Sequence, residues 1–188
     1  MRHTAAITAA LLLAALTAGC SSDSHGPTVS KATDTPAPVS SSPSSSPSPS
    51  EETYKLGDSI NISNAGIDFT VTALSFKDEG ISSLPGLLSA GEKWAVVEVK
   101  VCNTGSQVFS VSPFPWSLAY EDGARVQATG VSGAELPAPE YPVDAKAPGG
   151  DCVRGNIPFE VPKSGRAERV LYGPEDLEEP VEWTVPKA

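Results

Sequence analysis

Apolar and polar side chains alternate along most of the chain from Thr53 onward, as in β-strands that bury one face. The longest run covers residues 92–103, where one face of the predicted strand carries Ala95, Val97, Val99 and Val101. The same alternation predicts strands over residues 56–63, 66–76, 116–121, 125–129, 152–161, 169–172 and 181–185. No stretch repeats its apolar residues at the spacing of a helix. About eight short strands separated by turns predict an all-β fold, a β-sandwich.

Turn-forming residues separate several of these predicted strands. Asn64-Ala65-Gly66 lies between the first two, and its glycine accommodates the positive φ that tight turns require. Asp122-Gly123 is a second turn of this kind. Pro158 interrupts the polar face of its strand, which predicts an edge strand or a bulge because proline has no N–H to donate. Trp94 and Trp183 fall within predicted strands and are expected in the core.

The first residues have the organisation of a secretory signal peptide. Arg2 and His3 precede an apolar stretch, residues 4–18, that is rich in Ala and Leu. This stretch is shorter than the ~20 residues that a helix needs to cross a bilayer. Its length and polar start are those of a signal that is removed after export.

The signal ends in Leu16-Thr17-Ala18-Gly19-Cys20, which resembles the lipobox of bacterial lipoproteins. The resemblance implies that Cys20 receives a diacylglyceryl group and becomes the new N-terminus, so residues 1–19 form the signal peptide. Thr17 departs from the Leu that is more usual there. Buried acyl chains contribute ~0.8 kcal/mol per CH₂, enough to hold the protein on the extracytoplasmic face of the membrane. An ordinary secretory signal with cleavage nearby is the alternative.

Residues 20–52 are expected to form a lipidated cysteine followed by a disordered tether. Residues 21–52 contain 12 Ser and 6 Pro and almost no large apolar side chain, so they cannot bury enough surface to offset the ordering entropy. His25 lies within this tether. Glycosylation of its Ser and Thr residues is an alternative role for such a composition. The folded domain then covers residues 53–188.

Charge excludes one class of partner. The chain carries 23 acidic and 13 basic residues, a formal net charge of −10. A phosphate backbone is repelled by such a field, so nucleic acid is not an expected partner. The membrane is reached in this interpretation through the lipid on Cys20 and not through charge.

The other two cysteines are expected to pair. With Cys20 assigned to the lipid, Cys102 ends one predicted strand and Cys152 opens another. An oxidising compartment favours a disulfide, and a bridge closing a loop of about 50 residues stabilises a fold by roughly 4 kcal/mol on the chain-entropy model. Two free buried thiols are the alternative.

Several short motifs in this order and spacing resemble one family. They are Gly57-Asp58-Ser59, Gly91-Glu92-Lys93-Trp94, Asn103-Thr104-Gly105, Ser112-Pro113-Phe114 and Ile157-Pro158-Phe159-Glu160-Val161-Pro162. Together they resemble the telokin-like, immunoglobulin-like domain of bacterial lipoproteins, which is related in fold to an immunoprotective extracellular protein of mycobacteria. The resemblance covers about residues 54–185 and implies an immunoglobulin-like β-sandwich without an established reaction. Here Pro148-Gly149-Gly150-Asp151-Cys152 replaces the Pro-Gly-Glu turn that is usual in the family.

The predicted domain lacks the residues that most catalytic and metal-binding sites require. His3 and His25 both precede the predicted domain, which excludes histidine-based triads and metal sites within it. Carboxylate pairs remain as a hydrolase hypothesis, with Asp78/Glu79, Glu121/Asp122 and the run over residues 175–179 as candidates. All three are expected to be exposed loop charges, and the acidic run lacks the spacing of a dedicated Ca²⁺ loop. We expect neither an enzyme nor a cofactor.

Two long loops are the candidate partner-binding surfaces, because long loops in compact domains are often functional. The first covers residues 77–91 and carries Ile81, Leu84, Leu87 and Leu88; the second covers residues 130–150 and carries Tyr141. Phe114 and Trp116 form a third candidate, an exposed aromatic platform. In each case the alternative is that the apolar side chains cap the sandwich.

The sequence therefore favours a lipid-anchored, non-enzymatic binding or interaction module with an unknown ligand. A structural or antigenic envelope component without a specific ligand is the second hypothesis, and a carboxylate-based hydrolase is the third.

Overall fold

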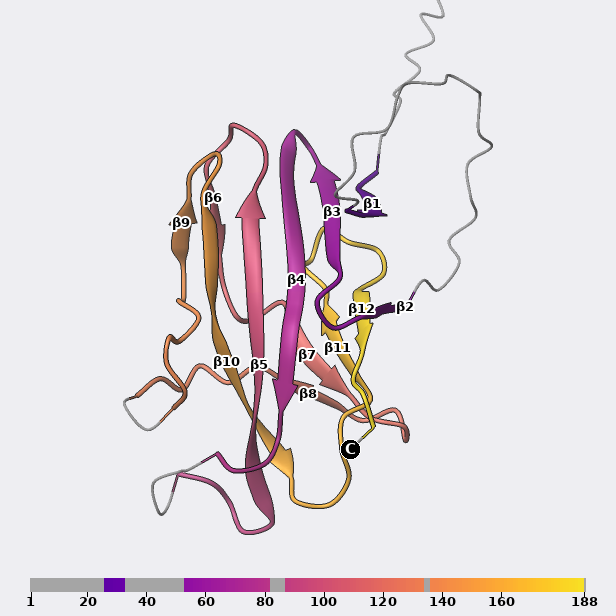
Figure 1. Ribbon diagram of the computed structural model, residues 1–188, viewed down its shortest axis with the longest axis vertical. Coiled ribbons are helices and arrows are strands. Elements are labelled where there is room, and N and C mark those ends of the chain that lie inside the picture. The colour runs from indigo at the N-terminus through magenta and orange to yellow at the C-terminus, as the bar shows by residue number, and fades with distance from the viewer. Residues whose placement is uncertain (1–25, 33–52, 82–86, 134–135, 188) are drawn as a thin grey trace, which may run out of the picture.

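The computed structural model describes residues 26–32, 53–81, 87–133 and 136–187. Within these residues the chain forms twelve strands and no helix, and two sheets pack face to face (Figure 1). This confirms the predicted all-β sandwich. No helix long and apolar enough to span a membrane is present in the described part of the chain.

The first sheet contains five strands in the order β1-β3-β4-β5-β10, all antiparallel to their neighbours. Their bounds are β1 Thr28–Lys31, β3 Ser59–Asn64, β4 Ile67–Lys77, β5 Glu92–Asn103 and β10 Cys152–Pro162. The turn between β3 and β4 has positive φ at Ala65 (48°) and Gly66 (83°), as the sequence predicts for the glycine. β10 lies at an edge, which is where a strand containing Pro158 is expected.

The second sheet also contains five strands, in the order β2-β12-β11-β7-β8. Their bounds are β2 Thr53–Lys55, β7 Trp116–Ala119, β8 Arg125–Gln127, β11 Arg169–Tyr172 and β12 Val181–Thr184. β2 runs parallel to β12, and the other pairs are antiparallel. A separate small sheet joins β6, Phe109–Val111, to β9, Ala145–Ala147. β9 lies within the predicted loop over residues 130–150.

Four strands escape the alternation pattern. β1, β2, β6 and β9 have only three or four residues each, and none of them falls within one of the predicted alternating runs. The expectation of disorder throughout residues 21–52 is wrong for β1. All four β1 side chains are exposed, so this strand is held by main-chain hydrogen bonds to the open edge of β3 and not by apolar burial.

An ion pair fastens β1 to the domain. The Lys31 ammonium lies 2.9 Å from an Asp58 carboxylate oxygen. The other Asp58 oxygen accepts the backbone N–H of Lys55 at 3.0 Å. These two donors, Lys31 first, lower the pKa of the Asp58 carboxyl below its ordinary value. The β1 segment, residues 28–31, is therefore tied to the β3 edge by its backbone pairing and by this ion pair.

The core fills the space between the two sheets with the inward faces of their strands. The β5 residues Ala95, Val97, Val99 and Val101 are 0–2% exposed. Trp116 and Trp183, both 0% exposed, stack with ring centroids 5.7 Å apart. The indole Nε1–H of Trp183 donates to the Asp58 carbonyl at 2.9 Å. Trp183 is a core residue as predicted, whereas Trp94 is buried outside this inter-sheet cluster.

The disulfide predicted between Cys102 and Cys152 is present. The two residues are directly opposite each other in the β5–β10 pair, with Cα atoms 4.0 Å apart. Cys102 belongs to the β5 face that carries Glu98 and Lys100, and Cys152 is exposed. The bond therefore lies on the outer face of the sheet.

Candidate functional site

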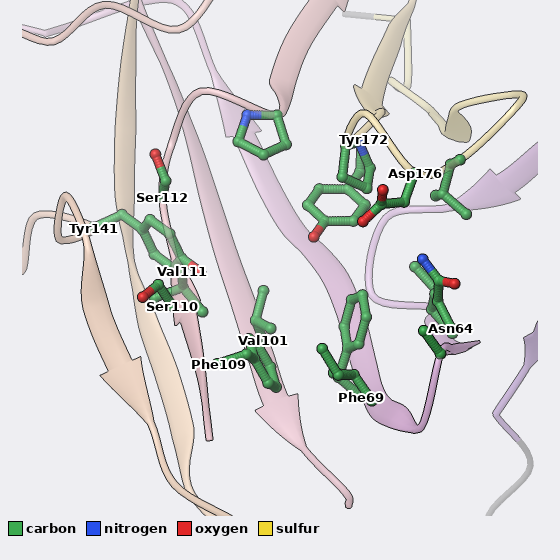
Figure 2. Close-up of a pocket in the computed structure, with 16 residues that line it drawn as sticks. Asn64, Phe69, Val101, Phe109, Ser110, Val111, Ser112, Tyr141, Tyr172 and Asp176 are labelled. Atoms are coloured by element: carbon green, nitrogen blue, oxygen red, sulfur yellow. The ribbon is translucent and has the colours of Figure 1, made fainter. Parts of the chain in front are cut away.

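A pocket of about 250 Å³ opens between the first sheet and the loop that follows β11 (Figure 2). The β3–β4 turn, β5, β6, the end of β11 and the segment around Tyr141 all contribute to its walls. An engineered apolar cavity of 150 Å³ holds benzene, so this pocket has room for a small organic molecule.

Four aromatic side chains from four separate parts of the chain line the pocket: Phe69, Phe109, Tyr141 and Tyr172 (Figure 2). The Phe69 ring centroid lies 5.3 Å from that of Phe109 and 6.4 Å from that of Tyr172. Tyr172 in turn contacts Trp116, with centroids 4.9 Å apart. The aromatic wall is thus continuous with the Trp116–Trp183 stack of the core, which gives it rigid support.

The Tyr141 hydroxyl is an unpaired polar group in this apolar setting. Tyr141 is 6% exposed, and its hydroxyl finds no hydrogen-bond partner among the described residues. Burial first, and then the neighbouring Tyr172 phenol, raises the pKa of Tyr141, so the hydroxyl keeps its proton at neutral pH. A buried hydroxyl without a partner costs free energy, and a ligand that hydrogen-bonds to it recovers that cost.

Main-chain contacts with β10 hold Tyr141 in place. The Tyr141 N–H donates to the Asn156 carbonyl at 2.9 Å, and the Asn156 N–H donates to the Pro139 carbonyl at 2.8 Å. Gly155 allows this close approach, because a Cβ there would lie 2.6 Å from both Tyr141 N and Tyr141 Cα. Real Cβ atoms do not come so near to backbone, so a glycine at 155 is required for Tyr141 to reach the pocket.

Among the polar side chains at the pocket rim, Asp176 is negatively charged and Ser110 is neutral. Asp176 lines the pocket from the loop after β11, is exposed, and forms no ion pair with any described residue. Ser110 lines the other side and accepts a hydrogen bond from Lys146 Nζ at 2.6 Å (Figure 2). Among the described lining residues none is Lys, Arg or His. The one formal charge in this lining is therefore the Asp176 carboxylate.

The structure does not bring Tyr141, Phe114 and Trp116, which the sequence predicts as partner-binding residues, together in one site. Tyr141 enters the pocket, whereas Phe114 is 57% exposed outside it. Trp116 is 0% exposed within β7, so the prediction that it belongs to an exposed platform is wrong. Its side chain is enclosed between the sheets by Trp183 and Tyr172.

The partner-binding role of the loop over residues 77–91 remains a prediction. Ile81 and Leu88 are half-buried, and Leu87 is 46% exposed. Leu84 and the proposed lipidation site Cys20 lie outside the described residues.

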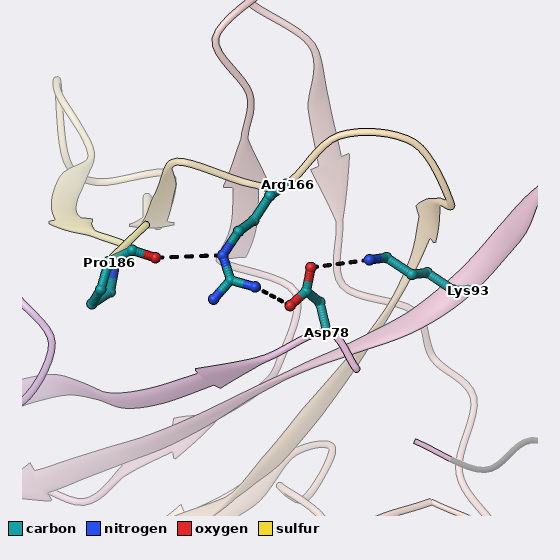
Figure 3. A network of polar contacts seen from close by, with 4 residues as sticks. All are labelled: Asp78, Lys93, Arg166 and Pro186. Atoms are coloured by element: carbon teal, nitrogen blue, oxygen red, sulfur yellow. Dashed lines mark hydrogen bonds and ion pairs between the residues drawn. The ribbon is translucent and has the colours of Figure 1, made fainter. Parts of the chain in front are cut away.

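The structure corrects the expectation that Asp78 is an exposed loop charge. Asp78 is 6% exposed at the far end of β4 from the pocket, and its two carboxylate oxygens pair with Lys93 and Arg166 (Figure 3). Lys93 Nζ donates at 3.0 Å. Arg166 also donates through Nε to the Pro186 carbonyl at 3.4 Å and lies 5.0 Å from the Phe76 ring centroid. Both Asp78 oxygens are paired, and these pairs hold three chain segments together. The role of Asp78 is therefore structural.

The remaining candidate carboxylates are exposed: Glu79, Glu121, Asp122 and the acidic residues over 175–179. Within the described part of the chain, no three His, Cys, Asp or Glu side chains gather as a metal site. Phe69, Phe109 and Tyr172 are not among the site residues predicted from the sequence, and Asp176 is predicted only as part of the acidic run over residues 175–179. The sequence predicts the strands that carry Phe69 and Tyr172 but not β6, which carries Phe109. Alternation also does not tell which buried rings face a cavity.

Comparison with known proteins identifies the family. The chain belongs to the family described as a domain of unknown function (DUF4352), whose model matches residues 54–180. This range agrees with the segment over which the sequence resembles lipoprotein domains. No curated protein matches the chain significantly.

Two solved structures share the fold. The secreted protein MPT63 of Mycobacterium tuberculosis is 17% identical, covering 73% of this chain and 99% of that one, with a TM-score of 0.57. The YjhA protein of Bacillus subtilis is 13% identical, covering 71% of this chain and 100% of that one, with a TM-score of 0.51. The predicted relationship in fold to the mycobacterial protein is confirmed. At these identities the likeness concerns the fold alone.

Proposed function

We propose that the chain is a membrane-anchored, extracytoplasmic binding protein whose β-sandwich takes up a small, largely apolar ligand without transforming it. The observation that carries this proposal is the buried, unpaired Tyr141 hydroxyl in an aromatic pocket. Ligand sites are typically concave and apolar with a few polar groups that orient the ligand, and this pocket has that composition.

The described side chains support binding over catalysis. None of the described lining residues is histidine or cysteine, and Asp176 is the single carboxylate among them. Glycoside hydrolysis of the usual kind needs two carboxyl groups on opposite sides of the reacting bond. Asp78, a buried carboxylate, forms ion pairs with Lys93 and Arg166. A binding role therefore accounts for the residues that the pocket contains.

Filling the pocket should abolish binding of a neutral aromatic probe. Indole is expected to bind the full-length chain with a Kd of about 1 mM or tighter, an affinity worth roughly 4 kcal/mol. Ile67, a half-buried lining residue, is the site for an Ile67→Trp change that occupies the space. Saturation-transfer NMR on the indole resonances measures the binding.

Val131→Trp provides the matched control, because Val131 is 37% exposed and does not line the pocket. It should bind indole as the wild type does. An indole signal that is absent from the wild type, or unchanged in Ile67→Trp, contradicts the proposed function and favours an envelope component without a specific ligand.

Anchoring is tested separately from binding. Cys20→Ala should release the protein from the membrane fraction, because lipid transfer requires the thiol of Cys20. Detection of the protein by immunoblot in the membrane and soluble fractions measures the change. Cys20→Ala protein that stays entirely with membranes contradicts the lipid anchor and leaves the binding proposal untouched.

A further inference from the structure

We infer that the ligand of this pocket carries an alkylated ammonium group, held between the aromatic wall and the Asp176 carboxylate. This inference rests on the proposed binding function and specifies the chemical class of its ligand. The two features that define the class, rings and an unpaired acid, lie on the same pocket lining.

The aromatic wall matches the hydrophobic surface of such a cation. The Phe69 ring contacts both the Phe109 ring and the Tyr172 ring, and Tyr141 lies on the opposite side of the pocket from Phe69 and Tyr172 in Figure 2. Aromatic ring faces attract cations through their quadrupole, and groups of rings are a recurrent solution for quaternary ammonium ions. Methyl groups on the nitrogen also remove the N–H donors that would otherwise need acceptors in this apolar space.

Charge selects a cation over a neutral or anionic ligand. Asp176 has no ion-pair partner among the described residues, whereas Asp78 has two, Lys93 and Arg166. Figure 2 draws the Asp176 carboxylate on the same side of the pocket as Tyr172. The described cation in contact with the lining, Lys146, bonds to Ser110 on the other side. The formal net charge of −10 adds a field of the same sign.

The pocket also sets the size of the ligand and gives it one polar contact. A volume of about 250 Å³ admits the ammonium group together with a ring or short chain. The Tyr141 hydroxyl is buried at the pocket wall without a described partner, so an oxygen on that body gains a hydrogen bond when a small rotation of the Tyr141 side chain exposes the hydroxyl. The geometry therefore fits a small amphiphilic cation whose charged end lies at the rim beside Asp176.

Two probes of equal shape test the inference. Phenyltrimethylammonium and tert-butylbenzene differ in the replacement of a charged nitrogen by carbon, and ligand-observed NMR titration gives the affinity of each for the full-length chain. The wild type should bind the ammonium probe about tenfold more tightly than the neutral one. Asp176→Asn should lower that preference to about threefold or less, because it weakens binding of the ammonium probe more than binding of tert-butylbenzene. Raising the salt concentration should weaken the preference, because Asp176 is exposed.

Glu179→Gln is the matched control, since it removes one negative charge from the same acidic run at a residue outside the pocket lining. It should retain the tenfold preference. Wild-type binding of tert-butylbenzene without preference for the ammonium probe overturns the inference and leaves the proposed function standing. Failure of both probes to bind overturns the proposed function as well. An equal loss of preference in Glu179→Gln also overturns the inference, because the preference would then come from overall charge.

Discussion

Replacing Trp183 by alanine is expected to lower the free energy of unfolding by about 3–5 kcal/mol, the range for large-to-small changes at buried aromatic residues. Trp183 is 0% exposed, stacks on Trp116 and donates its indole N–H to the Asp58 carbonyl. The change leaves a cavity between the two sheets and an acceptor without its donor. Urea denaturation followed by far-UV circular dichroism measures the loss.

The same change should weaken indole binding in the protein that remains folded. Trp116 stands between Trp183 and the pocket residue Tyr172, so a cavity at position 183 removes support from the aromatic wall. Phe114→Ala is the control, because Phe114 is 57% exposed and its removal should change stability by less than about 0.5 kcal/mol. Similar losses in both variants would contradict the assignment of the core.

Alternation succeeds as a predictor where a strand buries one face for several residues. The interval 92–103 was predicted to the residue because Ala95, Val97, Val99 and Val101 point into the core while Glu98 and Lys100 face solvent. In β4 the alternation is regular up to Ala73, and the register with β5 shifts between Ala73 and Ser75. Long amphipathic strands thus determine most of the sandwich.

Alternation does not predict structure that depends on main-chain pairing or on contacts with residues distant in sequence. β1 has four exposed side chains and is held by its backbone on the β3 edge, so its composition resembles that of a tether. Residues 116–121 are correctly predicted to contain a strand, but every residue of β7 from Trp116 to Ala119 is buried, so the pattern does not show that Trp116 lies in the core and not on an exposed platform. Asp78 is buried because Lys93 and Arg166, distant in sequence, converge on it.

The pocket is a further case of this kind. Tyr141 was selected from the sequence as an aromatic residue in a long loop, but its partners in the pocket come from β4, β6 and β11. The residue that admits Tyr141 to the pocket is Gly155 on β10, whose absent side chain leaves room for the Tyr141 backbone. A pocket formed by such non-local packing leaves no periodic signal in the sequence.

Removing the disulfide is the second large change, and it should destabilise the fold without altering the pocket. The Cys102→Ala/Cys152→Ala double variant is expected to lose up to about 4 kcal/mol of unfolding free energy, because the unfolded chain regains the entropy of a loop with a sequence separation of 50 residues. For a domain of this size the loss corresponds to a fall in Tm of about 10–15 °C. Differential scanning calorimetry measures the shift.

The position of the bond explains why the pocket should survive its loss. Cys102 and Cys152 join the outer face of β5 and β10, and the two strands remain paired over the rest of an eleven-residue register. Treating the wild type with a reductant should lower its Tm to that of the double variant while indole binding, measured below both transitions, stays the same. A Tm that does not respond to reduction would show that the bond adds no stability, and lost binding would show that it positions the pocket. Because the bond acts mainly on the unfolded chain and Trp183 acts within the folded core, combining the two changes should give additive losses in stability.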